Sequence, residues 1–308
     1  MTPAVFARHE SFHPRHGWLK KGFDKAKVDP ALFLREDANV VLGVGKNMVR
    51  AIQYWCHATK VLQDGPVASG RSCVSRPTPF GELLLGEGGL DPYLEDLGSL
   101  WLLHWQLIKE PSEATAWRFL FFNFAHLEFS IDSLTASLSD FVTKVYPNAR
   151  TARSSLRKDA ACIVRMYGER SPRATGEESI QCPFAELGLI RASSQDHRFS
   201  FRVGQKPGLS HRVVAAIAFD YVASFHGSPR TVTLSRLLRE EGGPGLALRL
   251  SEADLYEALE RASREHGGLV LTESAGMIQL AFDANPAELS EHFIASHYRP
   301  VVKEEVAR

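Results

Sequence analysis

Residues 42–52 read LGVGKNMVRAI, and their glycines allow two interpretations of the local fold. A phosphate-binding loop of the nucleotide-hydrolase type needs a glycine five positions before the Gly-Lys pair and a hydroxyl residue directly after it. Those positions are Val40 and Asn47, so we expect no nucleotide cofactor here. A helix-turn-helix instead needs a glycine turn between two helices that pack together. Gly43 supplies the turn, and the packing residues are Ala38, Leu42, Val44, Val49 and Ile52.

The longer helix after this turn, closed by Asp64-Gly65, is the candidate DNA reader. Asn47, Arg50 and Tyr54 recur at helical spacing on a face away from the packing residues, and Lys46 stands at the helix start. Arginine can bind guanine, asparagine can bind adenine, and lysine serves phosphates. The alternative is a solvated polar face on any helical domain. We favour DNA contact because the glycine turn and the basic composition agree.

Charge is strongly segregated although the formal net charge is zero. Residues 1–62 contain ten Lys/Arg against five Asp/Glu, and residues 144–173 contain eight against two. Residues 82–113 carry seven acids against one base, and residues 239–308 carry thirteen against seven. Separate basic faces are what local phosphate binding requires. The acidic C-terminal part is a better candidate for contact with proteins.

A second basic helix is expected within residues 146–168, YPNARTARSSLRKDAACIVRMYG. Arg153, Arg157 and Lys158 lie near its start, where Ser154 and Ser155 could cap the helix. A helix N-terminus offers free amides to a phosphate, so one interpretation is a clamp on the DNA backbone. The other is an exposed basic helix without a ligand.

The pattern of elements predicts a mainly α fold with small β wings. Residues 1–112 are expected to form a winged-helix or helix-turn-helix domain, with a hairpin wing in residues 76–96 before an apolar helix at about 97–109. Residues 113–175 are expected to be a helical, basic connecting region. Residues 176–308 are expected to form a C-terminal winged-helix-like domain.

That last domain is predicted from three helical stretches and a hairpin. The helices are HRVVAAIAFDYVASF, TLSRLLREE and SEADLYEALERASREHG, and two strands follow around Ser274-Ala275-Gly276. Residues 171–182, SPRATGEESIQC, have the composition of a linker.

Neither export nor membrane insertion is indicated. The longest apolar run, residues 117–129, is too short for a bilayer span and contains charged residues, so it predicts a buried helix. The N-terminus lacks the pattern of a secretion signal. We expect a cytoplasmic protein with no membrane partner. The four cysteines contain no C-x-x-C pair, which argues against a zinc knuckle.

The richest chemical cluster is ARHESFHPRHGWLKKGFD, residues 7–24. It contains four potential metal ligands and three cations that could hold a scissile phosphate: His9, Glu10, His13 and His16, with Arg15, Lys20 and Lys21. The spacing is not H-E-x-x-H, and Pro14 interrupts any helix. The alternative is structural, with His9-Glu10 hydrogen-bonding the chain to its neighbours while the cations face solvent or DNA.

Four ordered motifs carry a family resemblance. They are HESFHPRHGWLKKGFD, LGVGKNMVRAIQYWC, GLDPYLEDLGSLWLLHWQL and CPFAELGLI. The chain resembles an uncharacterised bacterial domain family whose genes lie beside phosphoadenosine-phosphosulfate-reductase-like and cysteine desulfurase genes, and within it the SspB-type proteins of the single-stranded DNA phosphorothioation system. The resemblance implies a nicking endonuclease of double-stranded DNA. Its cut would help partner proteins exchange a phosphate oxygen for sulfur in antiphage defence. Those partners are a cysteine desulfurase, an ATPase and an ATP pyrophosphatase-type sulfur-transfer protein.

The family's opening motif resembles G-H-E-T-F-P-x-R-x-G-W-L-x-K. It matches His9, Glu10, Phe12, Arg15, Gly17, Trp18, Leu19 and Lys21, whereas His13 and His16 fall on variable positions. His9, Glu10 and Arg15 are therefore the catalytic candidates. Chemistry suggests His9 or Glu10 as general base or contact to Mg²⁺ or Mn²⁺, and Arg15 as a stabiliser of phosphate charge.

Two other functions stay open. A non-catalytic adaptor would recognise the modification sequence and recruit the sulfur-transfer enzymes. A transcriptional regulator of the defence operon would bind one promoter site as a homodimer with palindromic half-sites.

Overall fold

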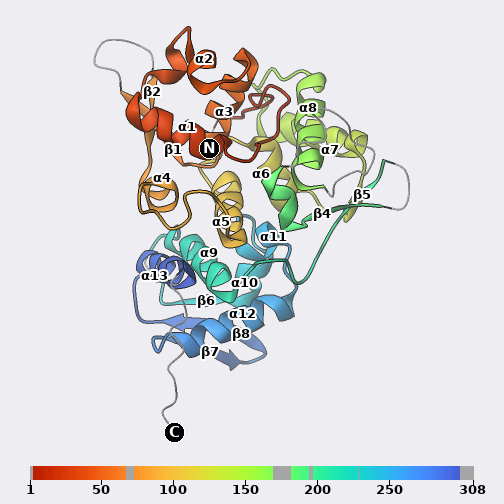
Figure 1. Ribbon diagram of the computed structural model, residues 1–308. Helices are drawn as coiled ribbons and strands as arrows, with labels where there is room; N and C mark the ends of the chain where they lie inside the picture. Colours follow the sequence, from red (N-terminus) through yellow and green to blue (C-terminus); the bar gives the residue numbers. More distant parts are fainter. Residues whose placement is uncertain (1–2, 67–72, 169–181, 194–196, 228, 299–308) are drawn as a thin grey trace.

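The arrangement of the chain was obtained as a computed structural model. It describes residues 3–66, 73–168, 182–193, 197–227 and 229–298. Within these residues, helices dominate and three small antiparallel sheets accompany them, so the expected mainly α fold with small β elements is confirmed. Figure 1 shows an upper lobe that contains α1 to α8 and a lower lobe that contains α9 to α13.

The upper lobe begins with helices and one hairpin. In order these are α1 (Trp18–Val28), a short 3-10 helix (Leu32–Leu34), α2 (Ala38–Leu42), α3 (Lys46–Ala58), β1 (Leu62–Pro66), β2 (Cys73–Pro77), α4 (Pro79–Leu85) and α5 (Leu97–Ile108). It continues with α6 (Thr115–Phe122), β3 (Glu128–Phe129), α7 (Ile131–Val145), α8 (Arg153–Tyr167), a 3-10 helix (Pro183–Leu187), β4 (Ile190–Ala192) and β5 (Phe199–Phe201). Strands β3, β5 and β4 form a sheet in that order.

The predicted turn between two helices is present at Gly43. It caps the C-terminus of α2 with φ of 63°, a left-handed conformation that glycine adopts without steric cost. Helix α3 starts at Lys46 as expected. It ends at Ala58, however, and Asp64-Gly65 lie inside β1 instead of closing the helix.

The position predicted for the first hairpin was wrong. Strands β1 and β2 pair antiparallel directly after α3, from Leu62 opposite Pro77 to Pro66 opposite Cys73. Residues 76–96, where the hairpin was expected, contain α4 and a series of turns. The apolar helix expected at 97–109 is confirmed as α5, and the Asp96 side chain accepts a hydrogen bond from Gly98 N at its start.

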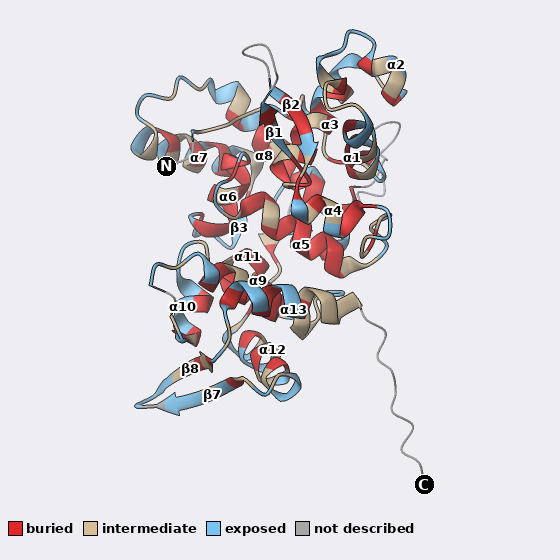
Figure 2. Ribbon diagram, turned by 90° about the vertical axis from the view of Figure 1, so that its left-hand side faces the viewer, coloured by how far each residue is buried: buried red, intermediate tan, exposed pale blue. Residues whose placement is uncertain are grey.

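The lower lobe contains the expected three helices and hairpin together with elements that were not expected. Its elements are α9 (His211–Ala223), β6 (Thr231–Thr233), α10 (Leu234–Arg239), α11 (Pro244–Leu248), α12 (Glu252–Glu265), β7 (Leu269–Ser274), β8 (Met277–Phe282) and α13 (Pro286–Tyr298). Strand β8 lies between β6 and β7 in an antiparallel sheet. The β7–β8 hairpin projects from the lobe (Figure 2); its tip is exposed, whereas Leu269, Leu280 and Phe282 towards its base are buried.

One large cluster of buried hydrophobic side chains extends through both lobes. Trp55, Trp101, Trp117 and Tyr167 are among its fully buried members. In the apolar run at 117–129, the large apolar side chains from Trp117 to Phe124 and that of Phe129 are buried, but Asn123 and Leu127 are exposed, and only Thr115–Phe122 is helical. Within the described residues, no helix combines the length and apolar character needed to cross a membrane. The expected linker at 171–182 lies outside the described residues except for Cys182, so the division into domains stays a prediction.

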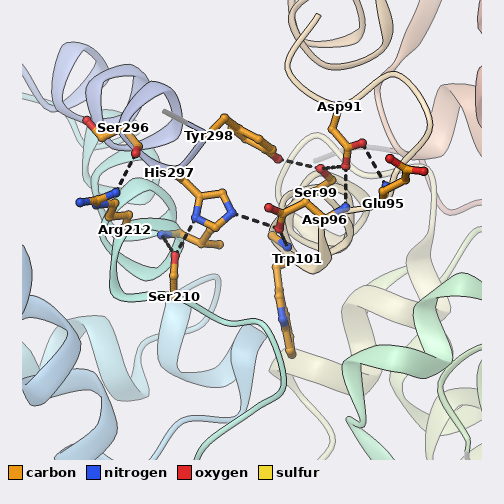
Figure 3. A network of polar contacts seen from close by, with 12 residues as sticks. Asp91, Glu95, Asp96, Ser99, Trp101, Ser210, Arg212, Ser296, His297 and Tyr298 are labelled. Carbon is orange, nitrogen blue, oxygen red and sulfur yellow. Dashed lines mark hydrogen bonds and ion pairs between the residues drawn. The ribbon is translucent and has the colours of Figure 1, made fainter. Parts of the chain in front are cut away.

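Hydrogen bonds between side chains connect the upper and lower lobes (Figure 3). The Ser99 hydroxyl at the start of α5 lies 2.7 Å from the hydroxyl of Tyr298 at the end of α13. The His297 ring bridges the lobes, with Nδ1 2.9 Å from Ser210 Oγ and Nε2 3.1 Å from Asp96 Oδ1. Each contact joins residues far apart in the sequence, so the C-terminal helix fixes the lower lobe against α5.

Candidate nucleic-acid interface

The opening motif is held in the interior by one buried polar pair. His9 Nε2 lies 2.7 Å from Asp159 Oδ1 on α8, and the same carboxylate oxygen accepts a hydrogen bond of 2.9 Å from Ala7 N. The rings of Trp55 and Trp117 pack around His9, at centroid distances of 6.1 and 5.6 Å. Burial raises the pKa of Asp159, while the bond to His9 opposes that shift. His9 is fully buried, so it cannot touch a DNA phosphate in this conformation.

Two further hydrogen bonds hold the opening segment between α3 and α8. Trp55 Nε1 on α3 donates to the carbonyl of Phe12 at 2.9 Å. Arg165 Nη2 on α8 donates to the carbonyl of Ser11 at 3.0 Å. The two helices that the charge pattern singled out are therefore joined through the opening motif.

The remaining catalytic candidates lie closer to the surface. The Glu10 carboxylate lies 3.5 Å from the Arg50 guanidinium of α3, with side chains 33% and 70% exposed. Arg15 is half-buried and stacks over the rings of Trp18 and Phe12, at 5.1 and 5.6 Å from the centroids. Glu10 thus borders the exposed face of the proposed reading helix.

On α3, three of the four expected DNA-contacting side chains are exposed and one is not. Lys46, Asn47 and Arg50 face solvent, as the helical spacing predicted. Tyr54 is only 8% exposed, and its hydroxyl donates to the carbonyl of Glu113 at 3.4 Å. Burial raises the pKa of Tyr54 well above its ordinary value. The expected DNA contact by Tyr54 was wrong, because the later turns of α3 are covered on more than one side by the rest of the lobe.

The adjacent lysines of α1 face different neighbours. Lys20 Nζ bonds Asp24 Oδ1 at 2.7 Å and the carbonyl of Leu85 at 3.1 Å, so its charge is already paired. Lys21 is exposed and donates to the carbonyl of Leu42 at 3.3 Å, directly before the turn at Gly43. Only Lys21 lies beside the predicted helix-turn-helix.

On α8, the expected cations Arg153, Arg157 and Lys158 are exposed. Arg157 forms an ion pair with Asp132 of α7, which neutralises part of the charge. The expected serine caps were wrong: Ala152 is the N-cap residue, with no side-chain hydrogen bond, and Ser154 lies inside the helix.

The sequence did not identify Asp159 or Arg165 as part of this site. Asp159 is a single carboxylate at the edge of the apolar stretch DAACIV in an otherwise basic helix. Such a residue would be costly to bury without a partner, which is a signal that a contact exists. The partner, His9, is 150 positions away in the sequence, so local patterns around Asp159 cannot identify it.

The expected metal ligands have different partners. His9 bonds Asp159 in the interior, whereas Glu10 lies beside Arg50. In the described part of the chain, no group of three or more His, Cys, Asp or Glu side chains is arranged to hold a metal ion. These residues do not fit a metal site built from protein ligands alone.

Comparison with known proteins places the chain in a family. Residues 6–298 match the model of a family described as a protein of unknown function (DUF4007), and the chain belongs to that family. Two crystal structures of SspB are similar over nearly the whole chain. The magnesium-bound form and another SspB structure have TM-scores of 0.92 and 0.91, and each is 38% identical over 97% of this chain and 91% of its own. The resemblance to SspB-type proteins is confirmed. No curated protein matches the chain.

Proposed function

We propose that this chain is a DNA-binding nicking endonuclease that cuts one strand in support of DNA phosphorothioate modification in antiphage defence. One observation carries the proposal: the opening segment joins the basic helices α3 and α8 and holds Glu10 beside Arg50. The likeness to SspB structures supports a role in the phosphorothioation system, and it fits cutting and recruitment equally well.

In this proposal, α3 reads the DNA and α8 holds its backbone. Arg50 and Asn47 would contact base edges, and Lys46 would contact a phosphate. Arg153 and Lys158 of α8 carry exposed charges with no carboxylate partner among the described residues, so they are suited to phosphates.

The chemistry assigned to the opening motif is hydrolysis of one phosphodiester bond. Glu10 would accept a proton as water attacks phosphorus and the bond to the leaving oxygen breaks, and Arg15 would stabilise the charge that develops on the phosphate. His9 would act through Asp159 as a positioning residue, since it is buried. The Arg50 guanidinium lies 3.5 Å from the Glu10 carboxylate, so it helps to fix the position of that carboxylate beside α3.

The test is nicking of supercoiled plasmid by purified protein, scored as open-circle product. It includes Mg²⁺, Mn²⁺ and chelator, because Mg²⁺ can be held by one or two carboxylates together with substrate phosphates. Glu10→Gln should lower the nicking rate by at least about 100-fold while DNA binding is retained. Glu36→Gln, which changes another glutamate in the same lobe, is the matched control. Equal nicking by wild type and Glu10→Gln would overturn the assignment.

The burial of His9, which keeps this catalytic candidate away from DNA, favours a second candidate, the non-catalytic adaptor. An adaptor would bind DNA and recruit the sulfur-transfer proteins without cutting. In the plasmid assay, folded and DNA-bound protein that yields no open circles at any metal concentration would establish this alternative.

We place the proposed contacts with the desulfurase, the ATPase and the sulfur-transfer protein on the acidic lower lobe, in the cytoplasm. On α12, Arg261 and Arg264 are already paired with Glu257 and Glu260. The remaining acidic side chains suit basic protein surfaces better than DNA.

A further inference from the structure

The small sheet β3-β5-β4 has two chemically different faces. Phe129, Phe199 and Phe201 belong to a packed set of rings, with centroids 5.4 Å apart for Phe129 and Phe201. Strand residues alternate between faces, and paired residues point to the same side. Arg191 is paired with Ser200, so the two lie on the face opposite Phe201.

Arginines on both sides of Ser200 extend this outer face. The antiparallel pairing continues beyond the strand ends, because Ser193 N donates to the carbonyl of Arg198 at 2.8 Å and Arg202 N donates to that of Leu189 at 3.0 Å. Arg198 and Arg202 are two residues from Ser200 in opposite directions. They therefore project to the same side as Ser200 and Arg191.

Little acidic charge offsets these arginines. Residues 187–212 contain five Lys/Arg and one Asp/Glu. Glu128, opposite Ser200 on β3, is a carboxylate on the outer face, and within the described residues no ion pair links it or another acid to Arg191, Arg198 or Arg202. Burial lowers the pKa of Lys206 to about 8; the charge of Asp254 opposes this shift, while the positive charges of Arg202, Arg249 and Arg191 add to it. Lys206 is thus close enough to Arg191 and Arg202 to be repelled by them.

We infer that this outer face, carried by Arg191, Arg198 and Arg202, is a second contact for the phosphate backbone of duplex DNA. The sheet lies beside α8, since Gly168 at the C-terminal end of that helix forms a parallel bridge with Ile190 of β4. Arginines that have no carboxylate partner among the described residues are suited to a polyanion, and arginine can bind phosphate bidentately. The inference rests on the proposed DNA binding and adds a surface outside α3 and α8.

The test measures how the affinity of the full-length protein for a labelled duplex depends on salt. Arg191→Gln/Arg198→Gln/Arg202→Gln should reduce the slope of log K against log salt by about 2 to 3, since each phosphate contact contributes about 0.9. Arg191→Lys/Arg198→Lys/Arg202→Lys should have the same slope of log K against log salt as wild type, because lysine retains the positive charge. The matched control Arg239→Gln/Arg261→Gln/Arg264→Gln removes three arginines that already have carboxylate partners and should leave the slope unchanged.

Arg50→Ala separates the inference from the proposed function. It should weaken binding to specific DNA by about 5- to 150-fold. If wild type does not bind DNA, the proposed function fails. If Arg50→Ala weakens binding but the glutamine triple variant does not change the slope, the inference alone is overturned, and an acidic protein becomes the partner to seek for this face. If the glutamine triple variant has a lower melting temperature than wild type, the lysine triple variant decides instead. A reduced salt slope in the lysine variant, which keeps all three charges, would also overturn the inference.

Discussion

His9 and Asp159 lie 150 residues apart in the sequence, and their side chains meet at 2.7 Å with only 1% of each exposed. The contact ties the opening segment to α8. Breaking a buried polar pair by removing one partner is costly, because the other group stays buried without its partner. The pair therefore contributes, with the bonds from Trp55 and Arg165, to holding the opening motif between the two basic helices.

The first prediction concerns stability. His9→Ala should lower the free energy of unfolding by about 3 to 5 kcal/mol, measured by urea denaturation. The control is His16→Ala, because the His16 side chain is 60% exposed and lies 3.8 Å from Glu186, so its removal should cost no more than about 0.5 kcal/mol. In addition, His9→Ala and Asp159→Ala should be non-additive when combined. Additive losses would show that the pair does not act as a unit.

The second prediction concerns pH. His104 is fully buried, with Nδ1 2.7 Å from the Tyr167 hydroxyl and Nε2 3.0 Å from the carbonyl of Ala247. Burial lowers the pKa of His104 from 6.5 to about 4. The folded pKa is below the unfolded one, so this contribution to stability is present above pH 6.5 and is lost as pH falls towards 4. Its size is about 3 kcal/mol.

The measurement is the free energy of unfolding between neutral pH and the acid range, for wild type and for His104→Gln. Glutamine keeps hydrogen-bonding groups but does not titrate. The decrease on acidification should be smaller in the variant by about 2 to 3 kcal/mol. Parallel pH profiles for the two proteins would contradict the assignment to His104.

Local signals account for the parts of the fold that the sequence predicted. Gly43 indicates the turn before α3, and the apolar spacing indicates the helices and final hairpin of the lower lobe. Strands β1 and β2 were misplaced, because LQDGP and CVSRP have little apolar alternation while the Pro/Gly pattern of residues 76–96 resembles a hairpin.

The site depends more on contacts between distant residues. Arg50 and Tyr54 are one helical turn apart, yet Arg50 is exposed and Tyr54 is covered by the region around Glu113. His9 and Glu10 are adjacent, yet one is in the core and the other is at the surface. Sequence spacing gives the side of a helix on which a residue lies, but not which neighbours cover that side.

The last prediction uses the adjacent lysines of α1 as a matched pair. Lys21→Gln should reduce the slope of log K against log salt for duplex binding by about 0.9, because Lys21 lies at the Leu42 carbonyl beside the turn before α3. Lys20→Gln removes the same charge, but Lys20 is paired with Asp24 of α1 and bonds the carbonyl of Leu85 of α4. Because Lys20 is not available to a phosphate, the slope for this variant should equal that of wild type. The readout is fluorescence anisotropy of a labelled duplex over a range of salt concentrations. Equal decreases for both variants would mean that general electrostatic attraction, and not a contact beside the turn, accounts for the effect of Lys21.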